Sequence, residues 1–153
     1  MLKQRASEVG IVDDDARAVA QDLLDTMHAH ERCVGIAANQ IGSLARCVVV
    51  DVTGHAKAKT CHGLIVLFDP EVVSAEGTEV AREGCLSLPD LTANVRRATN
   101  VVVRGLGPDG DEIRIETDAF EARALLHEID HLDGVLFLDR VASLATDVFR
   151  RKR

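Results

Sequence analysis

The sequence predicts an α+β fold in which antiparallel β-sheets pack around a central helix. Apolar residues recur at helical spacing in two long segments, residues 14–30 and the segment between Asp118 and Gly134. Short runs rich in branched apolar residues lie between these segments, and turn residues separate the runs. Because helices and strands do not alternate along the chain, a parallel sheet of the nucleotide-binding type is not expected.

Length and charge limit the functions open to the chain. Its 153 residues, 46% of them hydrophobic, suffice for a single domain spanning residues 1–153. A net charge of −7 argues against binding to nucleic acid or to anionic lipid. No apolar run has the length of a membrane span or the position of a signal peptide, so a cytoplasmic protein without a membrane partner is expected. The four cysteines show no C-x-x-C spacing and are expected to be thiols.

The first third of the chain contains a helix and a segment of small residues. The helix is expected to be amphipathic, with His28 and His30 at the surface near its end. Residues 33–42 fit neither helical nor strand spacing, which favours a close approach of the backbone to another segment or to a ligand. Within this segment Gln40 is expected to bond to the backbone of a turn.

Short strands fill most of the remaining chain, and turns are expected at residues 76–77 and 107–110. Residues 53–63 are small and polar, which is typical of a variable surface loop. Cys47 lies in a strand-like run and is expected in the core. Strands are predicted at residues 46–52, 64–68, 72–73, 79–81, 93–97, 101–104 and 113–115.

The second helix has signals for both of its ends. Thr117 or Asp118 is expected to cap its N-terminus, with Glu121 in position for a capping box. Gly134 is expected to end it. The tail from residue 141 onward is expected to form one or two further helical turns.

The sequence His127-Glu128-Ile129-Asp130-His131 lies within this second helix. Histidines four residues apart project from one face of a helix and can hold one divalent cation, on which Glu128 can reach a water molecule as general acid or base. An exposed helix with two solvated histidines would show the same five residues. Two apolar stripes flank the motif, however, so the helix is expected to be buried, and buried histidines and a glutamate need a partner such as a metal.

Three segments together resemble the peptide deformylase family. In order, they are Gly35-Ile36-Ala37-Ala38-Asn39-Gln40, Glu83-Gly84-Cys85-Leu86-Ser87 and His127-Glu128-Ile129-Asp130-His131. The resemblance continues through residues 134–140 and covers nearly the whole chain. It implies an enzyme that removes the N-formyl group from N-formylmethionyl peptides of newly made proteins and releases formate.

The resemblance also implies roles for individual residues. Cys85, His127 and His131 are expected to bind one divalent metal ion, with Fe²⁺ favoured and Zn²⁺, Ni²⁺ or Co²⁺ also accepted by this ligand set. Glu128 is expected to transfer protons, while the Gln40 amide and the Leu86 backbone N–H stabilise an oxyanion. The substrate-binding residues implied are Val34, Gly35, Leu88, Phe120 and Ala124. The basic C-terminus suggests the ribosome exit region as a partner, and a monomer is expected.

Three positions depart from the family pattern. Cys33 stands where a glycine is usual, Leu126 where glutamine precedes the first metal histidine, and Arg96 where proline precedes Arg97. These departures leave two alternatives to a general deformylase, namely a specialised formylated substrate or a non-catalytic metal-binding descendant. A zinc peptidase is a weaker alternative. The intact metal ligands and the acid beside them favour an enzyme.

Overall fold

The computed structural model describes residues 5–30, 33–85, 88–135 and 148–150, with the backbone alone for residues 85, 88–91 and 148–150. Strands contain more of these residues than helices do, and all pairs of named strands are antiparallel. The predicted α+β class with antiparallel sheets is therefore confirmed. Within the described residues, neither helix is long and apolar enough to cross a membrane.

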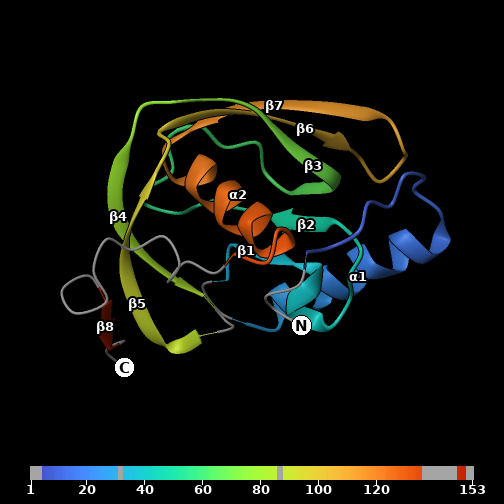
Figure 1. Cartoon of the computed structure of the whole chain (residues 1–153), viewed down its shortest axis with the longest axis horizontal. Coiled ribbons are helices and arrows are strands. Elements are labelled where there is room, and N and C mark those ends of the chain that lie inside the picture. Colours follow the sequence, from blue (N-terminus) through green and yellow to red (C-terminus); the bar gives the residue numbers. More distant parts are fainter. Residues whose placement is uncertain (1–4, 31–32, 86–87, 136–147, 151–153) are drawn as a thin grey trace.

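The strands form two sheets (Figure 1). The larger sheet has the order β1-β2-β3-β6-β7, and the smaller sheet has the order β4-β5-β8. The larger sheet comprises β1 (Gly35–Ala37), β2 (Cys47–Val50), β3 (Ile65–Glu76), β6 (Asn100–Leu106) and β7 (Glu112–Asp118). The smaller sheet comprises β4 (Glu79–Cys85), β5 (Leu88–Arg97) and β8 (Val148–Arg150). A 3-10 turn, η1 (Ala38–Ile41), follows β1 directly.

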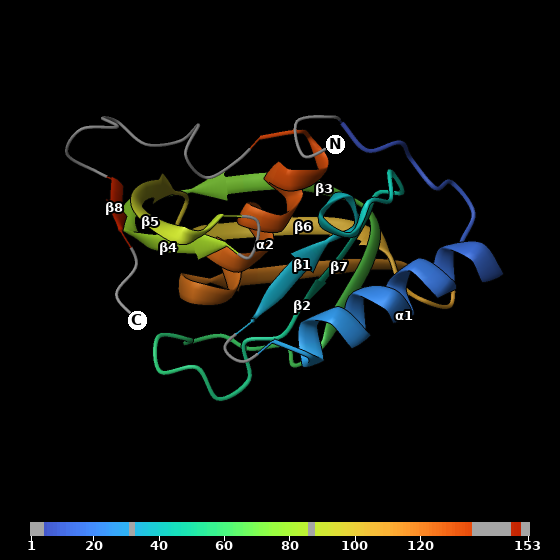
Figure 2. The ribbon, with the colours of Figure 1, turned by 90° about the horizontal axis from the view of Figure 1, so that it is seen from below.

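Helix α2 (Ala119–Leu132) lies at the centre of the molecule, with β3, β6 and β7 on one side and β4 and β5 on another (Figures 1 and 2). Its apolar side chains Leu125, Ile129 and Leu132 pack into one core with residues of β2, β3, β6 and β7. Nearly the whole helix is buried, charged residues included. The motif helix is thus central and enclosed, as its two apolar stripes predict.

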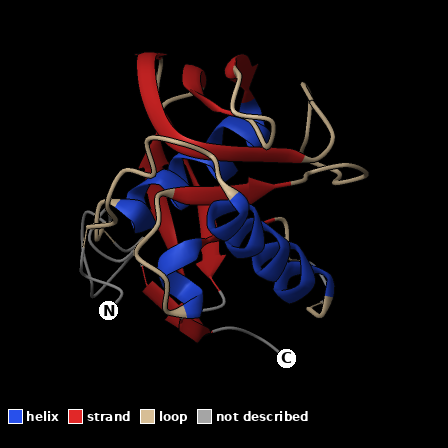
Figure 3. Cartoon of the chain, turned by 90° about the vertical axis from the view of Figure 1, so that its right-hand side faces the viewer, coloured by secondary structure: helices blue, strands red, loops and turns tan. Residues whose placement is uncertain are grey.

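Helix α1 (Asp14–His28) covers the other face of the larger sheet (Figure 3). Successive residues of β2 point to opposite faces of that sheet, so that Val48 and Val50 join the core of α2 whereas Cys47 and Val49 join that of α1. Cys47 is fully buried, and burial with the nearby charge of Asp69 raises the pKa of its thiol to about 12. The placement of Cys47 in the core is confirmed.

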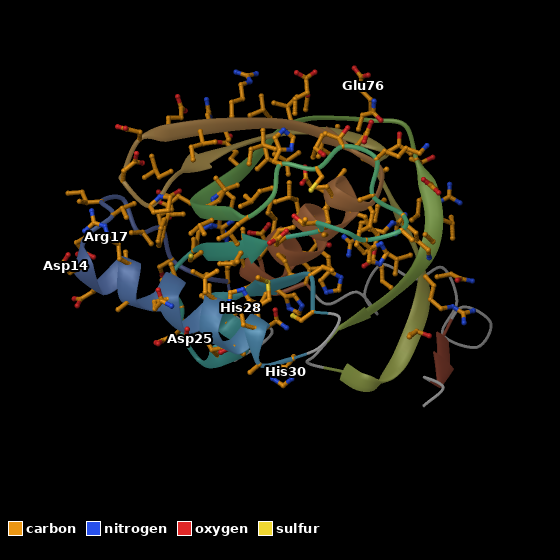
Figure 4. All side chains as sticks on the ribbon, turned by 180° about the vertical axis from the view of Figure 1, so that it is seen from behind. Asp14, Arg17, Asp25, His28, His30 and Glu76 are labelled. Atoms are coloured by element: carbon orange, nitrogen blue, oxygen red, sulfur yellow. The ribbon has the colours of Figure 1, made fainter. Side chains whose placement is uncertain are left out.

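The charged residues of α1 face away from the sheet. Asp14 and Arg17 lie at its first turn, while His28 and His30 lie near its end on the outside of the molecule (Figure 4). Both histidines are exposed, as the sequence predicts. The Asp13 side chain accepts a hydrogen bond from the Ala16 N–H and caps the helix.

The N-terminus of α2 differs from the prediction. Asp118 is the N-cap residue, but its side chain accepts a hydrogen bond from the Thr60 backbone N–H and not from the helix. The Glu121 carboxylate accepts bonds from Thr117 and from His62. The predicted capping box is wrong because the β2–β3 loop (residues 51–64) folds over this end of the helix and uses both acids. The same contacts show that the loop is not free to vary along its whole length.

The C-terminus of α2 follows the prediction. Gly134 has a positive φ of 77°, and its N–H donates to the His131 carbonyl while the Val135 N–H donates to the Asp130 carbonyl. These two bonds satisfy the last carbonyls of the helix in a Schellman motif. The expected helical turns of the tail are wrong for residues 148–150, which pair with β5 as a strand. Residues 141–147 lie outside the described residues.

Candidate functional site

Helix α2 brings three side chains together, which we call the His–Glu cluster: His127, Glu128 and His131. All three are buried, and their potential ligand atoms lie within 4.8 Å of one another. The spacing of three and four residues places them on one face of the helix, one turn apart. The clustering that the sequence predicts is therefore present.

Burial sets the protonation of two members of the cluster. Burial and the neighbouring His127 lower the pKa of His131 to about 3, so its imidazole is neutral near pH 7. Neutral imidazole is the form that binds metal. Burial raises the pKa of the Glu128 carboxyl to about 7, where a group can both accept and release a proton near neutral pH.

One oxygen of Glu128 gives a direct reason for a ligand in the cluster. Its Oε1 is buried and has no hydrogen-bond partner among the residues that the structure describes. Leaving such a group unsatisfied is costly, so a further donor or cation is expected beside it. Two imidazoles and a carboxylate are donors that suit a divalent metal with its water. The described residues therefore fit the metal that the family resemblance implies.

Glu83 on β4 holds the first histidine in place. The His127 Nδ1 donates a hydrogen bond of 2.7 Å to the Glu83 carboxylate, so a metal would be held through the opposite ring nitrogen, Nε2. Burial alone would raise the pKa of Glu83. The hydrogen bonds from His127 and Arg97 and the charge of Arg97 outweigh burial, and hold that pKa well below its usual range. Glu83 is therefore ionised and keeps the His127 proton on Nδ1.

The same carboxylate is part of a buried ionic network between the smaller sheet and α2. Arg97 on β5 donates to Glu83 through Nε at 2.9 Å and Nη2 at 3.0 Å, and Arg123 on α2 donates to it at 2.7 Å. Arg97 also donates to Asp130, which lies on α2 between His127 and His131. Each of these charged side chains is thus paired with one of opposite charge. Such pairing is needed because a buried charge without a partner is strongly destabilising.

No pattern in the sequence connects the residues of this network. Glu83 and Asp130 stand inside the family motifs, yet they lie 14 and 33 residues along the chain from their common partner, Arg97. Buried charge on an otherwise apolar helix is the one signal that could have indicated Arg123. Arg97 itself follows Arg96, one of the departures, and the structure shows Arg97 buried and Arg96 exposed.

Gln40 lies in η1, directly after β1. Its side-chain oxygen accepts a 2.9 Å hydrogen bond from the Ala37 backbone N–H, which is the bond to a turn that the sequence predicts. The amide NH₂ therefore points away from the Ala37 N–H. The neighbouring Asn39 is buried, and its side-chain amide donates to the His131 carbonyl. The η1 turn is therefore attached to α2 at the second histidine of the His–Glu cluster.

Gly35 provides space for Glu128. A Cβ atom at residue 35 would lie 2.8 Å from Glu128 Oε2, closer than side chains tolerate. The β1 backbone thus passes directly over the acid, which is the close approach predicted for this segment. The Cys33 thiol donates to the Gly35 carbonyl at 3.3 Å, so it lies beside the same backbone.

The other predicted residues are placed in part. Phe120 and Ala124 are one turn apart on α2 and share the face of the His–Glu cluster, and Val34 and Phe120 both pack against the core around α2. Cys85 ends β4, two residues beyond Glu83. The side chains of Cys85 and Leu88, and the whole of Leu86, lie outside the described residues.

Comparisons with known proteins identify one family. The family model described as polypeptide deformylase matches residues 1–147. A peptide deformylase of Thermodesulfovibrio yellowstonii is 40% identical over 152 residues, which cover 99% of this chain and 90% of that protein.

Solved structures agree as well. A peptide deformylase from Ehrlichia chaffeensis in complex with actinonin matches with a TM-score of 0.86 and 32% identity, over 94% of this chain and 84% of that one. A Met-Ala-Ser-bound class I type b peptide deformylase from Acinetobacter baumannii matches with a TM-score of 0.82 and 30% identity, over 91% and 92%. The chain belongs to the polypeptide deformylase family.

Proposed function

We propose that this chain hydrolyses the formamide of N-formylmethionyl peptides and that the His–Glu cluster is its reaction centre. Its family consists of hydrolases that act on N-formyl-methionyl peptides. The observation that carries the proposal is the buried Glu128 carboxyl, whose Oε1 has no partner in the described part of the chain and which lies beside two imidazoles. The relative that is bound to Met-Ala-Ser supports a methionyl peptide as product.

His127, His131 and Cys85 would hold the metal, and we expect Fe²⁺ first among the divalent ions that suit this set. When bound, the metal acts as a Lewis acid that activates water and polarises the formyl carbonyl. Glu128 accepts a proton as the water oxygen adds to the formyl carbon. It returns that proton to the peptide nitrogen as the C–N bond breaks, which yields formate and a free amine.

Two further groups stabilise the oxyanion that forms at the formyl carbon. The NH₂ of Gln40 is the first proposed donor, which is supported by the engagement of the Gln40 side-chain oxygen with the Ala37 N–H. The Leu86 backbone N–H is the second proposed donor. Apolar side chains of Val34, Leu88, Phe120 and Ala124 would receive the methionine side chain, at a gain of about 25 cal/mol per Å² of apolar surface buried.

Formate release tests the proposed function directly. The protein is purified without oxygen, loaded with Fe²⁺ and given formyl-Met-Ala-Ser. We expect formate and Met-Ala-Ser in equal amounts, while acetyl-Met-Ala-Ser is left intact. Cleavage within Met-Ala-Ser would favour the peptidase alternative. Metal-loaded protein that releases no formate from any formyl peptide would favour the non-catalytic descendant.

Replacing Gly35 by alanine should displace Glu128. The added Cβ would meet Glu128 Oε2 at 2.8 Å, and a shift of about 1 Å in a reacting group can lower the rate about 10²-fold. We therefore expect kcat to fall by up to that factor, with unchanged metal content. Gly107→Ala is the matched control, because its Cβ would meet the side chains of Ile113 and Asp109, neither of which belongs to the His–Glu cluster.

A second substitution shows whether the displacement of Glu128 is the cause. Glu128→Asp shortens the acid and removes the clash. It should therefore cost less activity in the Gly35→Ala background than in the wild type. Additive losses in kcat would contradict the explanation.

Glu83→Gln should weaken metal binding. The change removes the charge that holds the His127 ring, and losses of this kind lower metal affinity by about 10–100-fold. Glu79→Gln is the control, since its side chain is exposed on the same strand. Metal affinity is measured by competition with a chelator, at a temperature where circular dichroism shows both variants folded. Equal affinities would show that Glu83 has no part in holding the ligand.

A further inference from the structure

The β2–β3 loop is hydrogen-bonded to the first turn of helix α2. The His62 backbone N–H donates to Glu121 at 2.7 Å, and the His62 ring contacts the same carboxylate. The Glu121 carboxylate that accepts these contacts is fully buried, whereas His62 itself is exposed. The Thr60 N–H adds a bond of 3.2 Å to Asp118. The loop is thereby fixed on both sides of Phe120 in the helix sequence.

Five residues before the first of these attachments in the loop, the ring of His55 stacks on the ring of Phe120. The two ring centroids are 3.8 Å apart and the planes differ by 7°. The His55 ring is itself held by its own turn. Its Nδ1 accepts a 3.1 Å bond from the Lys57 N–H, and its carbonyl accepts one from the Ala58 N–H. A ring held in this way presents a fixed flat surface to Phe120.

Phe120 connects this stack to the reaction centre. It stands seven residues before His127, two helical turns and about 10 Å away on the same face of α2. The side chain of Ala124 lies between Phe120 and His127 on this face, and it is too small to fill the space between them. Phe120 is half-buried and packs on the same core as Val34, which follows Cys33 into β1. Any apolar group bound along this face beyond the cluster would meet the Phe120 ring.

We propose that His55 is a positioning residue for substrate specificity: it holds Phe120 in one orientation and so limits the size of the side chain accepted on the formylated residue. The inference rests on the proposed function. With His55 in place, the Phe120 ring can turn aside only by giving up the stack against a loop fixed at Glu121. Without it, the ring gains rotamers, and the space for the substrate side chain widens.

His55→Ala tests this role by comparing formyl-Met-Ala-Ser with formyl-Phe-Ala-Ser. We expect the ratio of kcat/KM, Phe over Met, to rise about three- to tenfold, which corresponds to the loss of one aromatic pair. The change should lie in KM, with kcat for formyl-Met-Ala-Ser and the metal content as in the wild type. Calorimetry should show the same preference for the products Phe-Ala-Ser and Met-Ala-Ser. His55→Phe keeps a flat ring and should keep the wild-type ratio.

His28→Ala, an exposed histidine on α1, is the matched control and should change nothing. An unmoved ratio in His55→Ala, an equal loss of kcat for both peptides, or a ratio that rises equally in His55→Phe would each overturn the inference. Formate release by the wild type separates the two proposals. If the wild type deformylates and the ratio is unmoved, only the role of His55 fails. If it deformylates neither peptide, the proposed function fails.

Discussion

Replacing Glu128 by glutamine should lower kcat by about 10²–10⁴-fold, the usual contribution of a general acid–base group. Glutamine keeps the size of the side chain, so Gly35 can still accommodate it, but it cannot accept and return a proton. The two histidines are untouched, and the metal should stay bound. The measurement is formate release under single-turnover conditions, with metal content determined on the same sample.

Glu121→Gln is the control for this prediction. Glu121 is also a buried glutamate on α2, but it bonds to Thr117 and His62 and has no contact with the cluster. Its replacement should lower stability and leave kcat close to the wild-type value. A Glu128→Gln variant that turns over at the wild-type rate would show that proton transfer at this site is assigned to the wrong residue.

Local sequence patterns were sufficient to predict the His–Glu cluster, the end of its helix and the buried position of Cys47. His127, Glu128 and His131 cluster because the helix itself spaces them, and helical spacing is visible in sequence. Gly134 ends α2 for a reason that is equally local, since only a residue tolerant of positive φ suits that position. Cys47 was predicted in the core because a short run of branched apolar residues surrounds it.

Non-local contacts were not predictable in the same way. Glu121 stood at the position of a capping-box acid, yet the His62 N–H, 59 residues away, takes that carboxylate instead. The hydrogen bond that Arg123 donates to Glu83 joins residues 40 positions apart, and the sequence near either residue does not indicate its partner. Strand β8 is defined by its pairing with β5, so its three residues alone gave no strand signal. In each case tertiary contact overrode or replaced the local preference.

Replacing any one of the proposed metal ligands by alanine should abolish metal binding and, with it, deformylase activity. His127→Ala and His131→Ala each remove one imidazole from a cluster whose ligand atoms lie within 4.8 Å. For Cys85 the argument is one of chain position, because β4 ends there two residues past Glu83, whose carboxylate contacts His127. Loss of the metal removes several kcal/mol of transition-state stabilisation, so deformylation should fall by at least about 10³-fold.

The other three cysteines are the controls, because the structure gives each another environment. Cys47 is a buried thiol whose pKa is raised to about 12, which disfavours the thiolate that metals bind. The Cys33 thiol donates to the Gly35 carbonyl, and the exposed Cys61 sulfur accepts from the Gly63 N–H. Alanine at each should leave the metal stoichiometry unchanged. Stoichiometric metal in Cys85→Ala, with loss in one of these three variants, would assign the sulfur ligand to a different cysteine and would place the reaction centre away from the end of β4.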